Sequence, residues 1–122
     1  MEQKEEVRHL LGQLLHHAPE ECPASFFLDY GRLLTKDGTS NSLSHAERVL
    51  LHGCTRFGEN VCLWTELGAV YLAQEAHDKA QRALSQATAL DPTNPNAWAL
   101  LAILFLRTNK LDPASHVHFS TR

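Results

Sequence analysis

The segment Trp64–Tyr71 reads WTELGAVY, and its order of large and small residues returns later in the chain. The recurring residues stand 34 positions apart, and they are Trp64, Leu67, Gly68 and Tyr71, then Trp98, Leu101, Ala102 and Phe105. Small and large apolar residues and a proline follow the first set, at Ala80, Leu84, Ala87 and Pro92. A fixed period of this length is the signature of a solenoid built from stacked helix pairs.

The spacing W-x2-L-G-x2-Y, followed by a small residue, a large apolar residue and a proline, resembles the tetratricopeptide repeat (TPR) family. The resemblance covers about residues 24–119 and is strongest over 61–94. It implies an all-α fold, a right-handed superhelix (α-solenoid) of antiparallel helix pairs. It also implies about three repeats and a protein–protein interaction scaffold or adaptor within a larger assembly. We expect about seven helices in total.

The first 23 residues predict a leading amphipathic helix, which is either a half-repeat or a cap. Its apolar residues recur at helical spacing, at Val7, Leu10, Leu11, Leu14 and Leu15. Prolines at 19 and 23 end this helix and begin a short turn.

Residues 24–60 predict a first TPR-like repeat that contains an inserted loop. Phe27, Tyr30, Gly31 and Leu34 align with the central repeat at an offset of 37 residues, and Ala46, Leu50 and Gly53 align at an offset of 34. Three additional residues must therefore lie between the two sets, and the polar segment 36–42 accommodates them as a loop. We expect the next helix to begin near Ser44, which forms a capping-box pattern with Glu47.

Residues 61–94 predict the second repeat, with a helix over about Val61–Gln74 and a second helix capped by Asp78. Residues 95–122 predict a third repeat whose second helix, starting at Asp112, is truncated. Asn94 is expected to cap the first helix of this repeat, with Pro95 in the first helical position. A fragment or short isoform of a longer array explains this organisation, and a free-standing short protein is the alternative.

The small residues of the pattern predict where helices approach one another closely. Gly68 inside a helix costs about 1 kcal/mol relative to alanine, so a packing gain must offset it. We expect Gly31, Gly68 and Ala102 to face Ala46, Ala80 and Ala114 on the partner helices. The aromatic residues of the pattern are interpreted as packing residues, and they are Trp64, Tyr71, Trp98 and Phe105.

In TPR arrays the first helix of each pair lines a concave groove, so the resemblance implies a binding surface here. The implied groove residues are Leu28, Arg32, Lys36, Thr65, Ala69, Leu72, Asn96, Ala99, Ile103, Leu106 and Arg107. This set is mainly apolar with cations near its edges, which suits a helical or extended segment of a partner protein or peptide.

The segment 97–106 is apolar on every side, a property of helices that are buried all round. We therefore expect Leu100, Ile103, Leu104 and Leu106 to contact a partner, a second copy or missing parts of a parent chain. The alternative to a scaffold is a self-associating structural module that stacks through its solenoid ends, above all the C-terminal end.

Composition and motifs give no support for other classes of protein. The net charge of -3 lacks the basic footprint of a nucleic-acid-binding protein, and no apolar run is long enough for a membrane span. No nucleotide-binding or hydrolase motif is present, and His116 and His118 point in different directions on a helix. We therefore expect no enzyme, cofactor or metal, and an enzyme or a metal-binding protein is the remaining alternative. The charges of Lys79 and Arg82 are interpreted as solvated.

Three cysteines without a CxxC pair favour reduced thiols and a cytoplasmic location.

Overall fold

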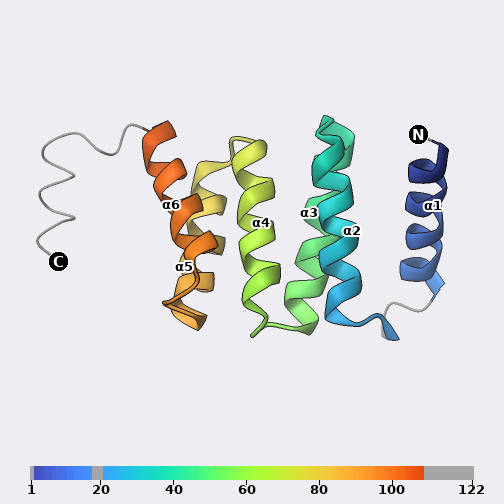
Figure 1. The fold of residues 1–122 in the computed structure, drawn as a ribbon, viewed down its shortest axis with the longest axis horizontal. Coiled ribbons are helices and arrows are strands. Elements are labelled where there is room, and N and C mark those ends of the chain that lie inside the picture. The colour runs from blue at the N-terminus through green and yellow to red at the C-terminus, as the bar shows by residue number, and fades with distance from the viewer. Residues whose placement is uncertain (1, 18–20, 109–122) are drawn as a thin grey trace, which may run out of the picture.

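The computed structural model describes residues 2–17 and 21–108, and this part of the chain is all-α, without strands. Its six helices are α1 (Glu2–His17), α2 (Ala24–Asp37), α3 (Ser40–Arg56), α4 (Val61–Ala73), α5 (His77–Leu90) and α6 (Pro95–Thr108). They follow one another along the long axis of the molecule (Figure 1). The predicted seventh helix, with Asp112, Ala114, His116 and His118, lies outside the described residues.

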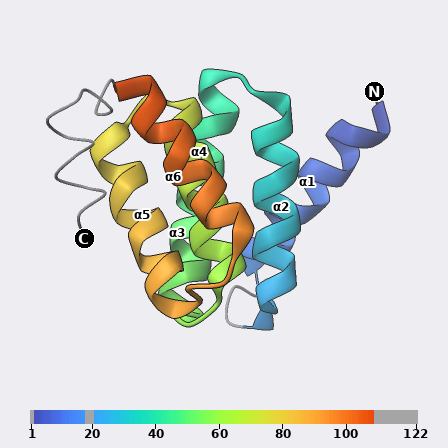
Figure 2. The ribbon, with the colours of Figure 1, turned by 60° about the vertical axis from the view of Figure 1, so that its left-hand side comes forward.

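The helices pack as antiparallel pairs, α2 with α3 and α4 with α5, because only short turns connect them. Helix α4 also contacts α2, α3 and α6, and α5 contacts α6. Helices α2, α4 and α6 thus form one layer, with α3 and α5 in the other (Figure 2). Within the described chain α3 and α5 do not contact each other, whereas α1 contacts α2 alone. This is the arrangement of a solenoid, as the repeat pattern predicted.

Two asparagines cap successive helices of the first layer in the same way. The Oδ1 atom of Asn60 accepts a hydrogen bond from the backbone N–H of Leu63, and Oδ1 of Asn94 accepts one from Ala97, both at 3.1 Å. Each bond satisfies a donor that the first turn of a helix leaves free. The prediction of Asn94 as cap, with Pro95 as the first helical residue, is confirmed.

The two tryptophans of the repeat also make equivalent hydrogen bonds. The indole Nε1–H of Trp64 donates to the carbonyl oxygen of Gly58 at 2.8 Å, and that of Trp98 donates to Pro92 at 2.7 Å. Each indole thereby holds the turn that precedes its own helix. The turns after α3 and α5 consequently have the same local construction, which makes the two helix pairs stack in a repeating manner.

Helix α3 begins at Ser40, so the predicted start near Ser44 is wrong. The capping interactions lie further upstream, where Thr39 Oγ1 accepts a hydrogen bond from the N–H of Ser42 at 3.2 Å. The hydroxyl of Ser42 in turn donates to Asp37 Oδ2 at 2.6 Å. These local bonds order part of the polar segment that the sequence assigns to a loop, and Ser44 is consequently inside the helix.

The predicted cap at Asp78 is also wrong, because α5 begins at His77 with Ala76 as its cap residue. The backbone makes this turn without a side-chain cap: the N–H of Ala76 donates to Tyr71 and that of Glu75 donates to Leu72. Glu75 adopts a left-handed conformation with φ of 60° to allow it. Asp78 instead lies in the first turn of α5, where a carboxylate interacts favourably with the helix dipole.

Both helix pairs contain a glycine that contacts a leucine of the partner helix. A Cβ atom added to Gly31 would lie 2.6 Å from Leu50, and one added to Gly68 would lie 2.5 Å from Leu84. The atoms nearest to the two glycines belong to these leucines, and the expectation that Ala46 and Ala80 face them stays a prediction. The close approach that motivated the expectation is present in both pairs.

The last helix departs from the packing expected of its aromatic and apolar residues. Trp98, interpreted as a packing residue, is 48% exposed, because among the described residues only α4 and α5 pack against α6. Leu104, expected to meet a partner, is instead buried within the domain. Ile103 and Leu106 remain exposed, at 38% and 63%.

We expect Gly68→Ala to lower the free energy of unfolding by about 1–3 kcal/mol, because the new methyl group must displace Leu84. The gain of about 1 kcal/mol in helix propensity is insufficient to offset this displacement. Urea denaturation followed by circular dichroism measures the change. Gly58→Ala is the control, since its Cβ would meet its nearest neighbour at an ordinary 3.5 Å. A Gly68→Ala variant as stable as the wild type would contradict the prediction.

Candidate protein-binding surface

The eleven residues of the predicted groove all lie on α2, α4 and α6, the helices of one layer. Seven are exposed: Arg32, Lys36, Asn96, Ala99, Ile103, Leu106 and Arg107. Leu28 and Ala69 are half-buried, whereas Thr65 and Leu72 are buried. We call the nine accessible residues the α2–α4–α6 face; its role in binding stays a prediction.

Thr65 and Leu72 are buried because α4 is the central helix of its layer and has a neighbour on each side. The hydroxyl of Thr65 donates to the backbone carbonyl of Val61 at 2.8 Å, so its hydrogen-bonding capacity is already used within α4. A charge introduced at Leu72 would be buried without a partner and would unfold the domain rather than test a surface.

An ion pair connects the first two helices of the α2–α4–α6 face. The Nε atom of Arg32 on α2 lies 3.2 Å from Oε2 of Glu66 on α4. The Arg32 side chain is 54% exposed, so the pair contributes about 0–1 kcal/mol at most. Its main effect is to hold two polar side chains in register across the face. Glu66 was absent from the predicted groove. The sequence signal that could have identified it is its opposite charge at a distance of 34 residues, one repeat period, from Arg32.

A second contact connects α4 to α6. The guanidinium Nη1 of Arg107 donates to the backbone carbonyl of Leu72 at 3.2 Å. The last turn of α4 contains no basic residue of its own, so Arg107 brings positive charge to the negative end of its dipole. Arg107 therefore has a structural partner in addition to its exposed surface.

The opposite side of the molecule carries a cleft of about 390 Å³ that the sequence did not reveal. Residues of α3, α4 and α5 line it, namely Leu51, Trp64, Leu67, Tyr71, Lys79, Arg82, Ala83 and Gln86. We call it the α3–α5 cleft. It forms because α3 and α5 do not contact each other, which leaves Trp64 of α4 half-buried at the cleft, whereas Leu67 and Tyr71 are buried beneath it.

Tyr71 is the most perturbed residue of the α3–α5 cleft. Its burial, together with the carboxylate of Glu47, raises the pKa of Tyr71 to about 12. The Nζ atom of Lys79 lies 5.8 Å from the centre of the Tyr71 ring, within cation–π distance. Tyr71 is therefore a neutral hydrogen-bond donor to Glu47 at physiological pH and presents its ring to a cation.

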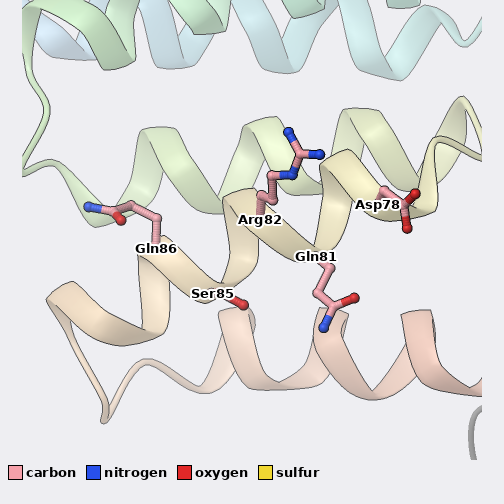
Figure 3. Close-up of a pocket in the computed structure, with 5 residues that line it drawn as sticks. All are labelled: Asp78, Gln81, Arg82, Ser85 and Gln86. Carbon is pink, nitrogen blue, oxygen red and sulfur yellow. The ribbon is translucent and has the colours of Figure 1, made fainter.

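Two further depressions are lined by polar and loop residues. One of about 520 Å³ is lined by Asp78, Gln81, Arg82, Ser85 and Gln86. All five belong to α5, with Gln81 and Ser85 on the side of α6 and Arg82 and Gln86 on the opposite side (Figure 3). The other, of about 560 Å³, follows the turn at residues 56–60. The lining of each contains a single carboxylate and no His or Cys, so neither has paired carboxylates, and Ser85 has no histidine beside it in the lining to activate its hydroxyl.

Within residues 2–17 and 21–108, no three His, Cys, Asp or Glu side chains come together in a way that could hold a metal ion. Over the same residues no helix is long and apolar enough to cross a membrane. Cys22, Cys54 and Cys62 form no disulfide, and burial raises the pKa of Cys54 to about 12. Cys62 is exposed.

We expect N-ethylmaleimide at neutral pH to modify Cys62 long before Cys54, because the thiolate reacts and Cys54 remains protonated and buried. Labelling of Cys54 should rise when denaturant unfolds the chain, because unfolding removes the burial that raises its pKa. Peptide mass spectrometry after timed labelling distinguishes the two sites, and Cys62→Ser should remove the fast reaction. Equal labelling rates in the native protein would contradict the burial of Cys54.

The sequence matches the family model of the cilia and flagella-associated protein 70 C-terminal domain over residues 1–121. No curated protein matches the chain. The match extends over nearly the whole chain, and its TPR character agrees with the packed helix pairs of the structure. The chain therefore belongs to the TPR-containing family of the cilia and flagella-associated protein 70 C-terminal domain.

Proposed function

We propose that this domain is a non-catalytic scaffold that binds a partner protein along the α2–α4–α6 face, as one part of a ciliary or flagellar assembly. The family supports a role in protein–protein interaction, and its name supports the organelle. A cytoplasmic location, in the interior of a cilium or flagellum, is part of the proposal. The free cysteines fit such a reducing environment.

The observation that carries this proposal is the connection of three helices into one surface. Arg32 joins α2 to α4 through Glu66, and Arg107 joins α4 to α6 through the carbonyl of Leu72. A partner segment would therefore meet a face whose helices are already held relative to one another. Such preorganisation lowers the entropic cost of binding.

The composition of the face indicates the kind of segment it would bind. Ala99, Ile103 and Leu106 expose apolar surface along one side of α6, at the spacing of successive helical turns. Arg32 and Lys36 are exposed on α2. An amphipathic helix suits this arrangement, with its apolar side on α6 and its acidic residues toward α2.

We expect a photo-crosslinking amino acid at Ala99 to capture a partner protein in ciliated cells, and the same amino acid at Arg48 to capture none. Both positions are exposed, but Arg48 lies on α3, outside the α2–α4–α6 face. Mass spectrometry of the crosslinked species identifies the partner and the contacted peptide.

A variant of the same protein, Ile103→Glu, tests whether the exposed apolar strip of α6 makes the contact, because it places a charge there. We expect it to remain helical by circular dichroism and to lose most of the crosslinking from Ala99. Two results would show that the α2–α4–α6 face is not the binding surface. One is capture of the same proteins from Ala99 and from Arg48, and the other is undiminished crosslinking from Ala99 in the Ile103→Glu variant.

Self-association is the second candidate function, because the first and the last of the described helices expose leucines. Leu10 and Leu14 of α1 are 60% and 47% exposed, and Leu106 of α6 is 63% exposed. Terminal repeats of solenoids require polar outer surfaces to remain monomeric, and these residues do not supply one. Stacking of α1 or α6 on another copy would cover them.

If the ends associate, sedimentation velocity at rising protein concentration should show species heavier than the monomer, and Leu106→Glu should shift them back toward the monomer. Leu51→Glu is the matched control, because Leu51 is an exposed leucine on α3 rather than on an end helix. A wild-type chain that stays monomeric throughout the concentration series would exclude this function.

A further inference from the structure

We infer that the α3–α5 cleft is a second binding surface, which takes a segment of a partner protein with an apolar side chain next to carboxylates. It lies among α3, α4 and α5 and shares no residue with the α2–α4–α6 face. The inference is therefore independent of the proposed function.

The base of the cleft is apolar and conformationally fixed. Trp64, Leu67 and Tyr71 come from three successive turns of one side of α4. The Nε1–H of Trp64 is bound to the carbonyl of Gly58 at 2.8 Å, which fixes the indole ring. The side chain of Leu51 on α3 remains 39% exposed at the margin of this base. Leu67 and Tyr71 are buried, so the apolar surface that a bound side chain could reach in this cleft of about 390 Å³ is that of Leu51 and the half-buried Trp64.

The α5 side of the cleft is cationic. Lys79 and Arg82 stand three residues apart, one helical turn, and both line the cleft. Neither forms an ion pair with any residue that the structure describes. The carboxylate of Glu47 does not line the cleft, and it already accepts hydrogen bonds from Tyr71 and from Gln74, the latter at 3.4 Å.

This charge distribution determines the chemistry of the occupant. Neither cation is ion-paired within the part of the chain that the structure describes, so carboxylates on the bound segment could pair with both. The Lys79 ammonium is oriented by the ring of Tyr71 at 5.8 Å, and the Arg82 guanidinium is exposed. A segment in which Asp or Glu flanks Leu, Phe or Met matches both features.

The test selects peptides from a random library displayed on phage, with the folded domain as the target. Recovered tryptophan-free sequences are synthesised with a fluorescein label, and their affinity is measured by fluorescence anisotropy. We expect the consensus to pair an apolar residue with Asp or Glu. We also expect affinity to fall as salt is raised, because salt screens the contacts with Lys79 and Arg82.

Matched variants locate the bound peptide. Arg82→Glu should weaken binding by about tenfold or more, whereas Arg48→Glu, with the same change in net charge, should change it by less than about twofold. Leu51→Ser should also weaken binding. In a Trp98→Phe background Trp64 is the remaining one of the two tryptophans, so its emission should shift when the peptide binds.

Three results would overturn the inference: a consensus without carboxylates, peptides that bind Arg82→Glu as tightly as the wild type, or no recovered peptide. Peptides that lose affinity with Ile103→Glu instead of Arg82→Glu would place binding on the α2–α4–α6 face. That outcome would support the proposed function and refute this inference. Circular dichroism of each variant excludes loss of folding as the cause.

Discussion

The contact between a glycine of one helix and a leucine of its partner is the constraint on which the structure depends. Gly31 receives Leu50 in the first pair, and Gly68 receives Leu84 in the second. With a side chain at either glycine, the leucine would have to move and the helices would separate. The close pairing keeps the second helix of each pair against the first, and this produces two layers. The layer of α2, α4 and α6 has a continuous surface, whereas the layer of α3 and α5 is divided by the α3–α5 cleft.

The continuous surface and the divided surface follow from the same stacking. Helix α4 contacts both α2 and α6, so the first layer is unbroken, with Arg32 and Arg107 connecting its helices. Helices α3 and α5 do not touch, so the second layer leaves the α3–α5 cleft. The same stacking therefore gives the domain two chemically distinct surfaces.

Sequence periodicity predicted the helices well where side chains carry the signal. Asn94 and Pro95 begin α6 as expected, because an asparagine cap and a proline in the first turn act locally. The starts of α3 and α5 were wrong for different reasons. At α3, Thr39 and Asp37 provide an earlier capping network. At α5, the backbone of the turn closes with Glu75 in a left-handed conformation, which no residue pattern in the segment indicates.

The sequence alone determined the period, the helix pairs and the positions of close packing, because these depend on residue size at fixed spacing. It also assigned the predicted groove residues to α2, α4 and α6, which form one layer in the structure. Only the tertiary structure decided that Thr65 and Leu72 are buried while Ile103 and Leu106 are exposed, since this depends on how many neighbours each helix has. The α3–α5 cleft is likewise tertiary. Lys79 and Arg82 are exposed, as the sequence predicted, but only the packing of α3 and α5 against α4 places both along one side of this cleft.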